Sequence, residues 1–307
     1  MPKDLIRPRP QLLCKIVVRL FLIAAVALSF CALAPAQEQA ASISAALPDA
    51  PAPQTSTPDD VTMRNTPRNL LHDQGAIWSS PARIRTHDLR WLLPLAAAAG
   101  VAFATDQHTM TQVVSHDASF NQASINTSNV LIGSWIAVPV AVYGFGHAHQ
   151  DEHARQAGIL TGESMVDGII VDEALKLVFL RERPNVDDAR GHFFQTSAAA
   201  NSSFPSAHSL IAWSAASALA AEYPAPWTQF ALYSAATSVS LTRVMGQEHF
   251  PSDVLVGSSL GWLIGHNVVK RHHKSREQGT GNRRRFLALS LPCSLAPLFP
   301  VFLLPVP

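Results

Sequence analysis

Residues 206–221 read SAHSLIAWSAASALAA, a run of alanine, serine and large apolar residues that lacks aspartate, glutamate, lysine and arginine. The run is longer than an ordinary strand and shows no strict alternation of apolar and polar residues, so it predicts a helix. Five more stretches have a helical composition, and only the third of them contains charged residues: 91–105, 129–147, 157–180, 223–242 and 254–269. We therefore predict an all-α fold, a bundle of about six core helices.

The composition favours a membrane protein or a strongly buried helical protein, because 48% of the residues are hydrophobic and only 15% are charged. A helix needs about 20 residues to span a membrane, with ~17 as the lower bound, so several of these stretches are barely long enough. Their alanine and serine content suits close packing between helices. We expect the bundle to be embedded in a membrane. The net charge of +1 gives no field that would recruit nucleic acid.

The N-terminus has the pattern of an export signal: basic residues, an apolar run over 20–33, and the small residues Ala34 and Ala36 around Pro35. We predict a signal peptide over 1–36, with an uncleaved N-terminal anchor as the alternative. Residues 37–89 are expected to form a Pro/Ala-rich linker and polar segment, and 90–272 the helical bundle. A basic and then Pro-rich apolar tail follows over 273–307, and the sequence does not indicate its role.

Charge at the two ends of the bundle leaves its orientation open. Basic residues flank both ends, so the positive-inside rule places both flanks in the cytoplasm and the polar motifs on the periplasmic side. A cleaved signal peptide would instead place residues 37–90 outside. Two localisations follow as alternatives: a bacterial-type inner membrane with the site facing the periplasm, or an exported periplasmic protein that associates with the membrane. The number of true membrane spans stays open as well.

Polar clusters interrupt the apolar stretches at three places. In the first, Lys176 and Arg183 are seven residues apart, nearly two helical turns, so they share a face if the helix continues that far. In the second, Pro205 and Ser206 stand at a helix start, where free N–H groups bind phosphate, and His208 projects from the same turn. Taken alone, the first cluster also fits a solvated basic helix end, and the second fits a capped helix start.

The third cluster contains Arg243, His249 and Asp253. The carboxylate follows the histidine by four residues at a helix entry, so it is placed to accept the Nδ1 proton and leave Nε2 as a nucleophile. Arg243 would add a planar fork that matches phosphate oxygens. A His–Asp pair that only caps a helix is the alternative interpretation.

The order of these motifs is lysine, six residues, Arg-Pro; then Pro-Ser-x-His; then arginine, five residues, histidine, three residues, aspartate. This order resembles the type 2 phosphatidic acid phosphatase / vanadium-dependent haloperoxidase superfamily, over roughly residues 90–272. Ala207 stands where that family usually has glycine, and Thr242 where it usually has serine. An alanine amide still donates unless the residue needs a positive φ, and threonine keeps the hydroxyl, so we expect both departures to modulate activity rather than abolish it.

The resemblance implies that His249 is the nucleophile and forms a phosphohistidine, that Asp253 orients it, and that His208 is the general acid for the leaving alkoxide. The implied phosphate ligands are Lys176, Arg183, Ser206, the Ala207 amide and Arg243. No metal or other cofactor is then required, because the cations neutralise the developing charge, and vanadate is expected to inhibit. The two histidines must begin a turnover in opposite protonation states, so we predict a bell-shaped pH profile.

The leading functional hypothesis is a hydrolase of the lipid phosphate phosphatase type that acts on a lipid phosphate or isoprenyl diphosphate at a membrane. The sequence does not indicate the head group, the chain or the oligomeric state. Three alternatives remain: a soluble periplasmic acid phosphatase with small substrates, a haloperoxidase with vanadate as cofactor, and a non-enzymatic bundle with a degenerate anion site. His149 and His153 have a spacing found in zinc sites, but we favour a solvated polar turn there.

Overall fold

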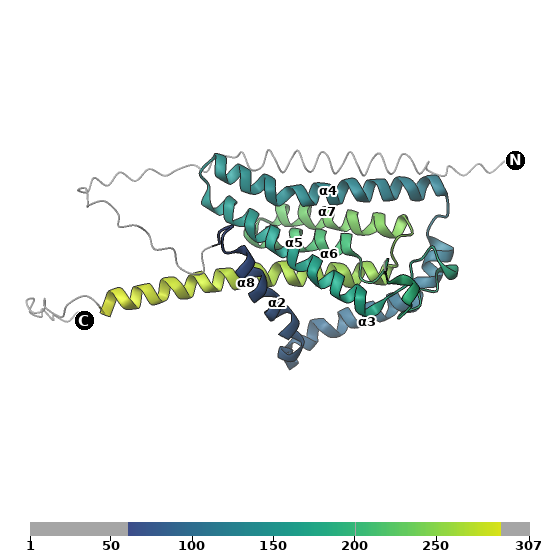
Figure 1. Ribbon diagram of the computed structural model, residues 1–307, viewed down its shortest axis with the longest axis horizontal. Helices are drawn as coiled ribbons and strands as arrows, with labels where there is room; N and C mark the ends of the chain where they lie inside the picture. The colour runs from purple at the N-terminus through teal and green to yellow at the C-terminus, as the bar shows by residue number, and fades with distance from the viewer. Residues whose placement is uncertain (1–60, 200, 290–307) are drawn as a thin grey trace, which may run out of the picture.

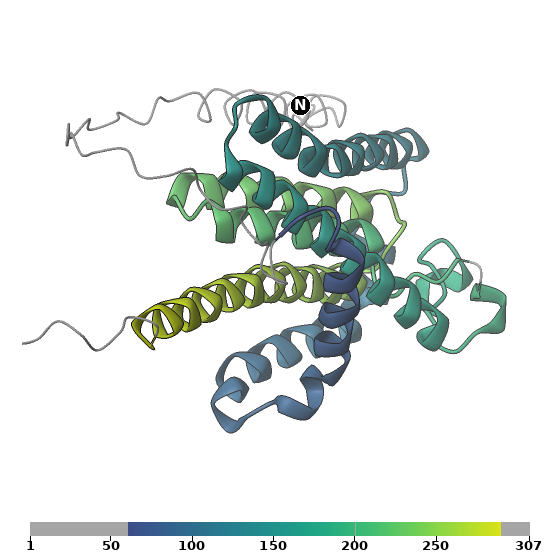
Figure 2. The ribbon, with the colours of Figure 1, turned by 60° about the vertical axis from the view of Figure 1, so that its left-hand side comes forward.

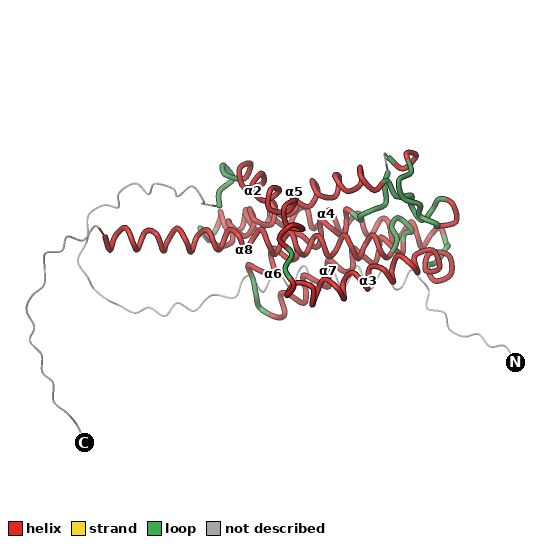
Figure 3. The backbone as a smooth tube through the Cα atoms, turned by 90° about the horizontal axis from the view of Figure 1, so that it is seen from below, coloured by secondary structure: helices red, strands yellow, loops and turns green. Residues whose placement is uncertain are grey.

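The computed structural model describes residues 61–199 and 201–289, with side chains up to residue 274 (Figure 1). Over these ranges the chain contains helices and no strand, which confirms the all-α fold (Figure 3). The six predicted stretches correspond to α3–α8, and a further helix, α2, precedes them. The bounds are α2 (Thr66–Ser79), α3 (Leu89–His108), α4 (Ala118–Ala148), α5 (Glu152–Phe179), α6 (Ala207–Glu222), α7 (Pro226–Met245) and α8 (Pro251–Leu289).

Helix α6 lies inside the bundle and contacts α5, α7 and α8. Its small side chains allow a close approach, and residues such as Ala212 and Ala216 have no exposed surface. The glycines of α8 serve the same purpose. A Cβ on Gly261 would overlap the backbone carbonyl of Leu210, and one on Gly265 would overlap the carbonyl of Ser214. The alanine, serine and glycine content noted in the sequence thus brings α6 and α8 into backbone contact.

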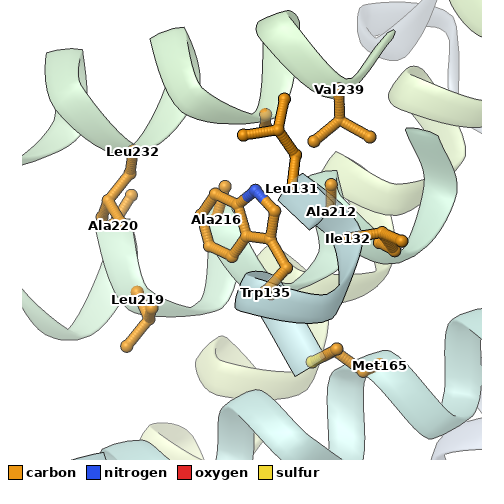
Figure 4. Close-up of a cluster of buried hydrophobic side chains, with 12 residues drawn as sticks. Leu131, Ile132, Trp135, Met165, Ala212, Ala216, Leu219, Ala220, Leu232 and Val239 are labelled. Carbon is orange, nitrogen blue, oxygen red and sulfur yellow. The ribbon is translucent and has the colours of Figure 1, made fainter. Parts of the chain in front are cut away.

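A large apolar cluster forms where α4 and α7 cover the alanine face of α6 (Figure 4). Trp135 of α4 is 3% exposed and fills the space that the small side chains leave, with Leu131 beside it and Leu232 and Val239 contributed by α7. Burying large side chains against small ones gives the interior its density without voids. This cluster fixes α6 relative to α7, and both helices carry site residues at one end.

Helix α4 lies on the outside of the bundle (Figures 1 and 2). Within the described part of the chain it is the one helix long and apolar enough to cross a membrane, with 31 residues and a mean hydropathy of 1.5 over its best window. Only 22% of that window is buried, and Val130, Ile136 and Val140 are each more than half exposed. The apolar outer face agrees with contact with lipid, and the length and composition of α4 make it a candidate span.

Three boundaries differ from the sequence prediction. Helix α2 packs on α5, so part of the polar segment within 37–89 belongs to the folded bundle. Helix α4 begins at Ala118, well before residue 129, because the Asp117 side chain accepts a hydrogen bond from the Phe120 amide at 2.8 Å and caps it. Helix α8 continues to Leu289, past residue 269. The predicted signal peptide over 1–36, most of the linker and the end of the tail lie outside the described residues.

Candidate active site

The three polar clusters meet at one end of the bundle, on the right in Figure 1. The C-terminal ends of α5 and α7 and the N-terminal ends of α6 and α8 lie there, together with the loop that joins α5 to α6. Lys176, Arg183, Arg243 and His249 all act electrostatically on His208, so residues from every cluster surround this imidazole. The packing of α6 against its neighbours therefore gathers distant parts of the chain into one site.

Two arginines from different clusters converge on a single oxygen atom. Oε2 of Glu248 lies 2.5 Å from Nη1 of Arg183 and 3.1 Å from Nη2 of Arg243. Arg243 is 5% exposed, and its Nε is buried without a hydrogen-bond partner among the described residues. Guanidinium groups in this arrangement form a binding site for an anion with several oxygens. Glu248 occupies part of this anion site and was not predicted from the sequence.

Lys176 and Arg183 do not lie on one continuous helix, so the condition for a shared helix face is not met. Helix α5 ends at Phe179, because Leu180 has left-handed backbone angles (φ 43°, ψ 52°). Arg183 therefore reaches the anion site from the loop. Lys176 remains in the last turn of α5, with its Nζ 2.7 Å from Oδ2 of Asp172. The two cations approach the site from different segments.

The N-terminus of α6 closes one side of the site. Ser206 is the N-cap residue and is fully buried, and its amide donates a hydrogen bond to the Asp253 carbonyl at 3.2 Å. Ala207 is the first helical residue and is not among the residues with positive φ. Alanine in place of glycine is therefore tolerated at this position without backbone strain.

His249 is held through its Nδ1 atom. Nδ1 lies 2.7 Å from the backbone carbonyl oxygen of Ser203, and because a carbonyl only accepts, Nδ1 must carry the proton. Nε2 is then the nitrogen with a free lone pair. The side chain is 2% exposed, and burial, helped by the nearby Arg183 and Arg243, lowers the pKa of His249 well below 6.5. A neutral imidazole with an available Nε2 is the form that acts as a nucleophile.

The direct hydrogen bond expected between His249 and Asp253 is not formed. Oδ2 of Asp253 lies 3.8 Å from Nδ1 of His249 and instead accepts from the Phe250 amide at 2.9 Å. Oδ1 accepts from Nη1 of Arg181 at 2.5 Å. Burial raises the pKa of Asp253 to about 6, although the charge of Arg181 opposes this rise. The Ser203 carbonyl is therefore the group that orients His249, and Asp253 acts on the ring from a greater distance.

Arg181 organises this part of the site and was missed by the sequence analysis. Its guanidinium donates to Asp253, to Ser252 Oγ at 2.8 Å, to Asp106 Oδ2 at 2.8 Å and to the Gly191 carbonyl at 3.2 Å. It also stacks on three rings, the nearest being Phe250 at 4.1 Å. Only weak sequence features could have indicated this role. Arg181 stands two residues before Arg183, and its partner Asp106 directly follows the apolar stretch 91–105.

Residues 158–277, which include all eight proposed site residues, match the model of the PAP2 superfamily. This stretch is a PAP2 domain. The resemblance drawn from the motifs is thereby confirmed. The chain is also similar to the lipid A 1-phosphatase of Porphyromonas gingivalis, with 28% identity over 181 residues. That match covers 58% of this chain and 37% of the relative, so the chain spans well under half of the relative's length. No solved structure matches the chain.

His208 lies in the first turn of α6 within this PAP2 domain. Burial first, and then the charges around it, lower the pKa of His208 to about 3. Both histidines are therefore neutral near pH 7, whereas general-acid catalysis needs a proton on His208. A bound phosphate brings negative charge that offsets the cations. The opposite protonation states expected from the sequence must therefore arise after substrate binds.

An apolar groove of about 680 Å³ begins beside the proposed site residues. Val244, Pro251 and Val254 line it, and each is next to a proposed site residue or within two residues of one. The groove then follows α3, α7 and α8, and its walls include Trp91, Trp213 and Trp262. Its lining is almost entirely apolar, so it suits a hydrocarbon chain rather than a polar substrate.

Proposed function

We propose that this protein is a metal-independent lipid phosphate phosphatase that forms a phosphohistidine on His249. The observation that carries the proposal is the pair of arginines, Arg183 and Arg243, directed at one anionic oxygen next to an Nδ1-protonated histidine. The apolar groove that begins at the same place favours a lipid over a small soluble ester. The PAP2 match and the lipid A 1-phosphatase relative support the same reaction class.

The reaction would proceed in two displacements. Nε2 of His249 attacks phosphorus, the bond from phosphorus to the ester oxygen breaks, and His208 donates its proton to the leaving alkoxide. Water then attacks the phosphohistidine while His208 accepts a proton from that water. The phosphorus–nitrogen bond breaks, phosphate leaves, and both histidines return to their starting states.

The remaining site residues stabilise charge on the phosphoryl oxygens. Lys176, Arg183 and Arg243 supply cations, and the start of α6 supplies two further donors, the Ser206 hydroxyl and the Ala207 amide, since the Ser206 amide is bonded to the Asp253 carbonyl. Fixed donors of this kind need no reorganisation during the reaction, which is why no metal ion is invoked at the phosphate. Vanadate, as a phosphate mimic, is expected to inhibit.

We infer that the protein works at a membrane, with α4 as the candidate span. The site at the end of the bundle would then meet a head group while the groove holds part of the chain. Of the two localisations that the sequence left open, the inner membrane with the site facing the periplasm is our proposal. Its test, in intact spheroplasts, is the access of protease to the α5–α6 loop, or of a thiol reagent to a cysteine introduced there, because the loop has no cysteine of its own.

The first experiment is phosphate release from a short-chain phosphatidate and from an isoprenyl diphosphate, measured in excess EDTA with wild type and His249→Ala. We expect the wild type to release phosphate and His249→Ala to release none. The control is His87→Ala, which removes an exposed histidine and should behave as the wild type. Release by both wild type and His249→Ala would refute the phosphohistidine. Bromide oxidation by peroxide and vanadate, without phosphate release, would identify a haloperoxidase instead.

A further inference from the structure

A second cluster of ionisable side chains lies on the other half of the bundle, where α2 meets α5 and α8 (Figure 1). Asp73 of α2, Glu163 of α5 and His272 of α8 direct one ligand atom each toward a common point, and these atoms lie within 4.8 Å of one another. Glu163 is 13 residues from Lys176 along α5, or about 20 Å, so this cluster is separate from the phosphate site. We propose that it binds a divalent transition-metal ion.

The three ligand atoms are buried and fall short of hydrogen-bond geometry with any described side chain. Oδ2 of Asp73, Oε2 of Glu163 and Nε2 of His272 have no hydrogen-bond partner among the residues whose side chains are described. The side chains of Asp73 and Glu163 are 3% and 0% exposed, and that of His272 is 11% exposed. A buried polar atom without a hydrogen bond destabilises the fold, so three such atoms that face one point favour a cation-binding site there.

Distances within the cluster fit a metal ion better than a proton. Nε2 of His272 lies 3.6 Å from Oδ2 of Asp73 and 3.7 Å from Oε2 of Glu163. Both distances are too long for hydrogen bonds. Zinc bonds to nitrogen and oxygen of about 2.1 Å place neighbouring tetrahedral ligands about 3.4 Å apart. The observed separations are therefore close to the edges of a coordination tetrahedron.

Surrounding groups hold the two carboxylates so that their free oxygens face inward. Oε1 of Glu163 accepts from Asn69 Nδ2 at 3.2 Å, and Oδ1 of Asp73 lies 3.3 Å from Nη1 of Arg271. Each carboxylate thus uses one oxygen for a supporting contact and keeps the other for the cluster. Metal sites use such outer contacts to orient their ligands.

Charge and ligand type narrow the identity of the ion. Asp73, Glu163 and the neighbouring Asp167 bring three carboxylates into one buried region, against Arg271 and His272. A divalent cation would balance this excess of negative groups. Imidazole with two carboxylates suits Zn²⁺ and its first-row neighbours better than Mg²⁺ or Ca²⁺, which prefer oxygen ligands alone. Three protein ligands also leave one position for water.

Bound metal would join α2 to the bundle, because the three ligands come from three helices. The test uses the purified full-length chain in detergent, stripped with EDTA and titrated with Zn²⁺ against a chromophoric chelator. We expect one equivalent to bind, with a rise in Tm of several degrees. Asp73→Asn, Glu163→Gln and His272→Gln should each weaken binding at least tenfold. His273→Gln is the matched control, because its imidazole contacts Glu222 at 2.8 Å and lies outside the cluster.

Co²⁺ binding to wild type gives a second readout that does not depend on whether the variants fold. Visible absorption typical of four- or five-coordinate Co²⁺ is expected, and Zn²⁺ should abolish it. Uptake of less than a tenth of an equivalent by wild type would overturn the proposal. Wild-type affinity in all three ligand variants, or equal loss in His273→Gln, would also overturn it. Since His249 is remote, phosphate release at low temperature should survive EDTA even where Tm falls.

Discussion

Glu248 occupies the anion site, so removing its charge should help a phosphate to bind. Its Oε2 bridges the guanidinium groups of Arg183 and Arg243. A substrate phosphate needs the same donors and must displace the carboxylate. Glu248→Gln keeps the shape and one weak acceptor but loses the negative charge. We expect this substitution to lower both the KM for a lipid phosphate and the Ki for vanadate.

The size of the effect follows from the two contacts. A hydrogen bond to a charged group contributes about 1.5–3 kcal/mol. The Glu248 side chain is 26% exposed, so solvent screening reduces this figure, and the amide retains part of the interaction. We expect about 1–2 kcal/mol tighter binding of the anion, which corresponds to about a 5- to 30-fold fall in Ki.

The assay is vanadate inhibition of phosphate release at fixed ionic strength, with Glu173→Gln as the control. Glu173 is 65% exposed and lies 3.6 Å from Lys176, so its substitution changes the net charge equally without vacating the anion site. We expect less than a twofold change for the control. A higher Ki or KM in Glu248→Gln would show that the carboxylate positions the arginines, and would refute the competition argument.

Three further predictions concern the groups around the site. Arg181→Met should reduce the free energy of unfolding by about 3–5 kcal/mol, because it leaves the buried Asp106 and Asp253 without their cation. The control is Arg190→Met on the exposed loop, which should change this free energy by less than about 0.5 kcal/mol. Denaturant titrations measure both. Thr242→Val should keep kcat/KM within a factor of two, because the Thr242 hydroxyl donates to the backbone carbonyls of Ser238 and Val239 rather than facing a substrate. A loss of more than tenfold would contradict this prediction. The third prediction concerns pH. In the folded protein the pKa of His208 is lowered to about 3, so between about pH 6.5 and pH 3 the unfolded chain binds a proton at His208 that the folded protein does not. The protein is therefore most stable above pH 6.5 and loses stability as the pH falls. Between pH 7 and pH 5 this loss is about 1–2 kcal/mol. His208→Gln should reduce the fall in the free energy of unfolding over this pH range by that amount, as measured in denaturant titrations.

Helices with uncharged apolar sequences were predictable, and those that depend on single polar contacts were not. The six predicted stretches correspond to α3–α8 because burial of alanine and leucine dominates their energetics. The first turns of α4 are rich in serine and asparagine, so the Asp117 cap that starts this helix has no hydrophobic signal. Helix α2 is polar along most of its length and gains its place from contacts with α5 and α8, including Gln74 to Asp167 at 2.9 Å. Such long-range contacts have no local pattern.

Within the site, too, residues that belong to a local sequence motif could be predicted, and residues that depend on long-range contacts could not. Lys176, Arg183, Arg243, His208 and His249 could be proposed because motif spacing identifies charged side chains directly. Glu248 and Arg181 have no distinctive spacing, since acidic and basic residues next to functional ones are common in loops. Their importance emerges only when the fold places one between two guanidiniums and the other against two buried carboxylates.

The correction at Asp253 shows why a spacing of four residues did not fix the hydrogen bond. That spacing brings the carboxylate near the imidazole, but the Phe250 amide and Arg181 both compete for its oxygens. If Asp253 bonded to His249 instead, the buried Phe250 amide or the Arg181 guanidinium would lack this partner. Nδ1 of His249 has another acceptor available, the Ser203 carbonyl. Every residue has a backbone carbonyl, so no sequence motif can reveal which one orients a histidine. Substitution of Asp253 by Asn should therefore leave the His249 tautomer unchanged and act mainly through the loss of negative charge near the ring.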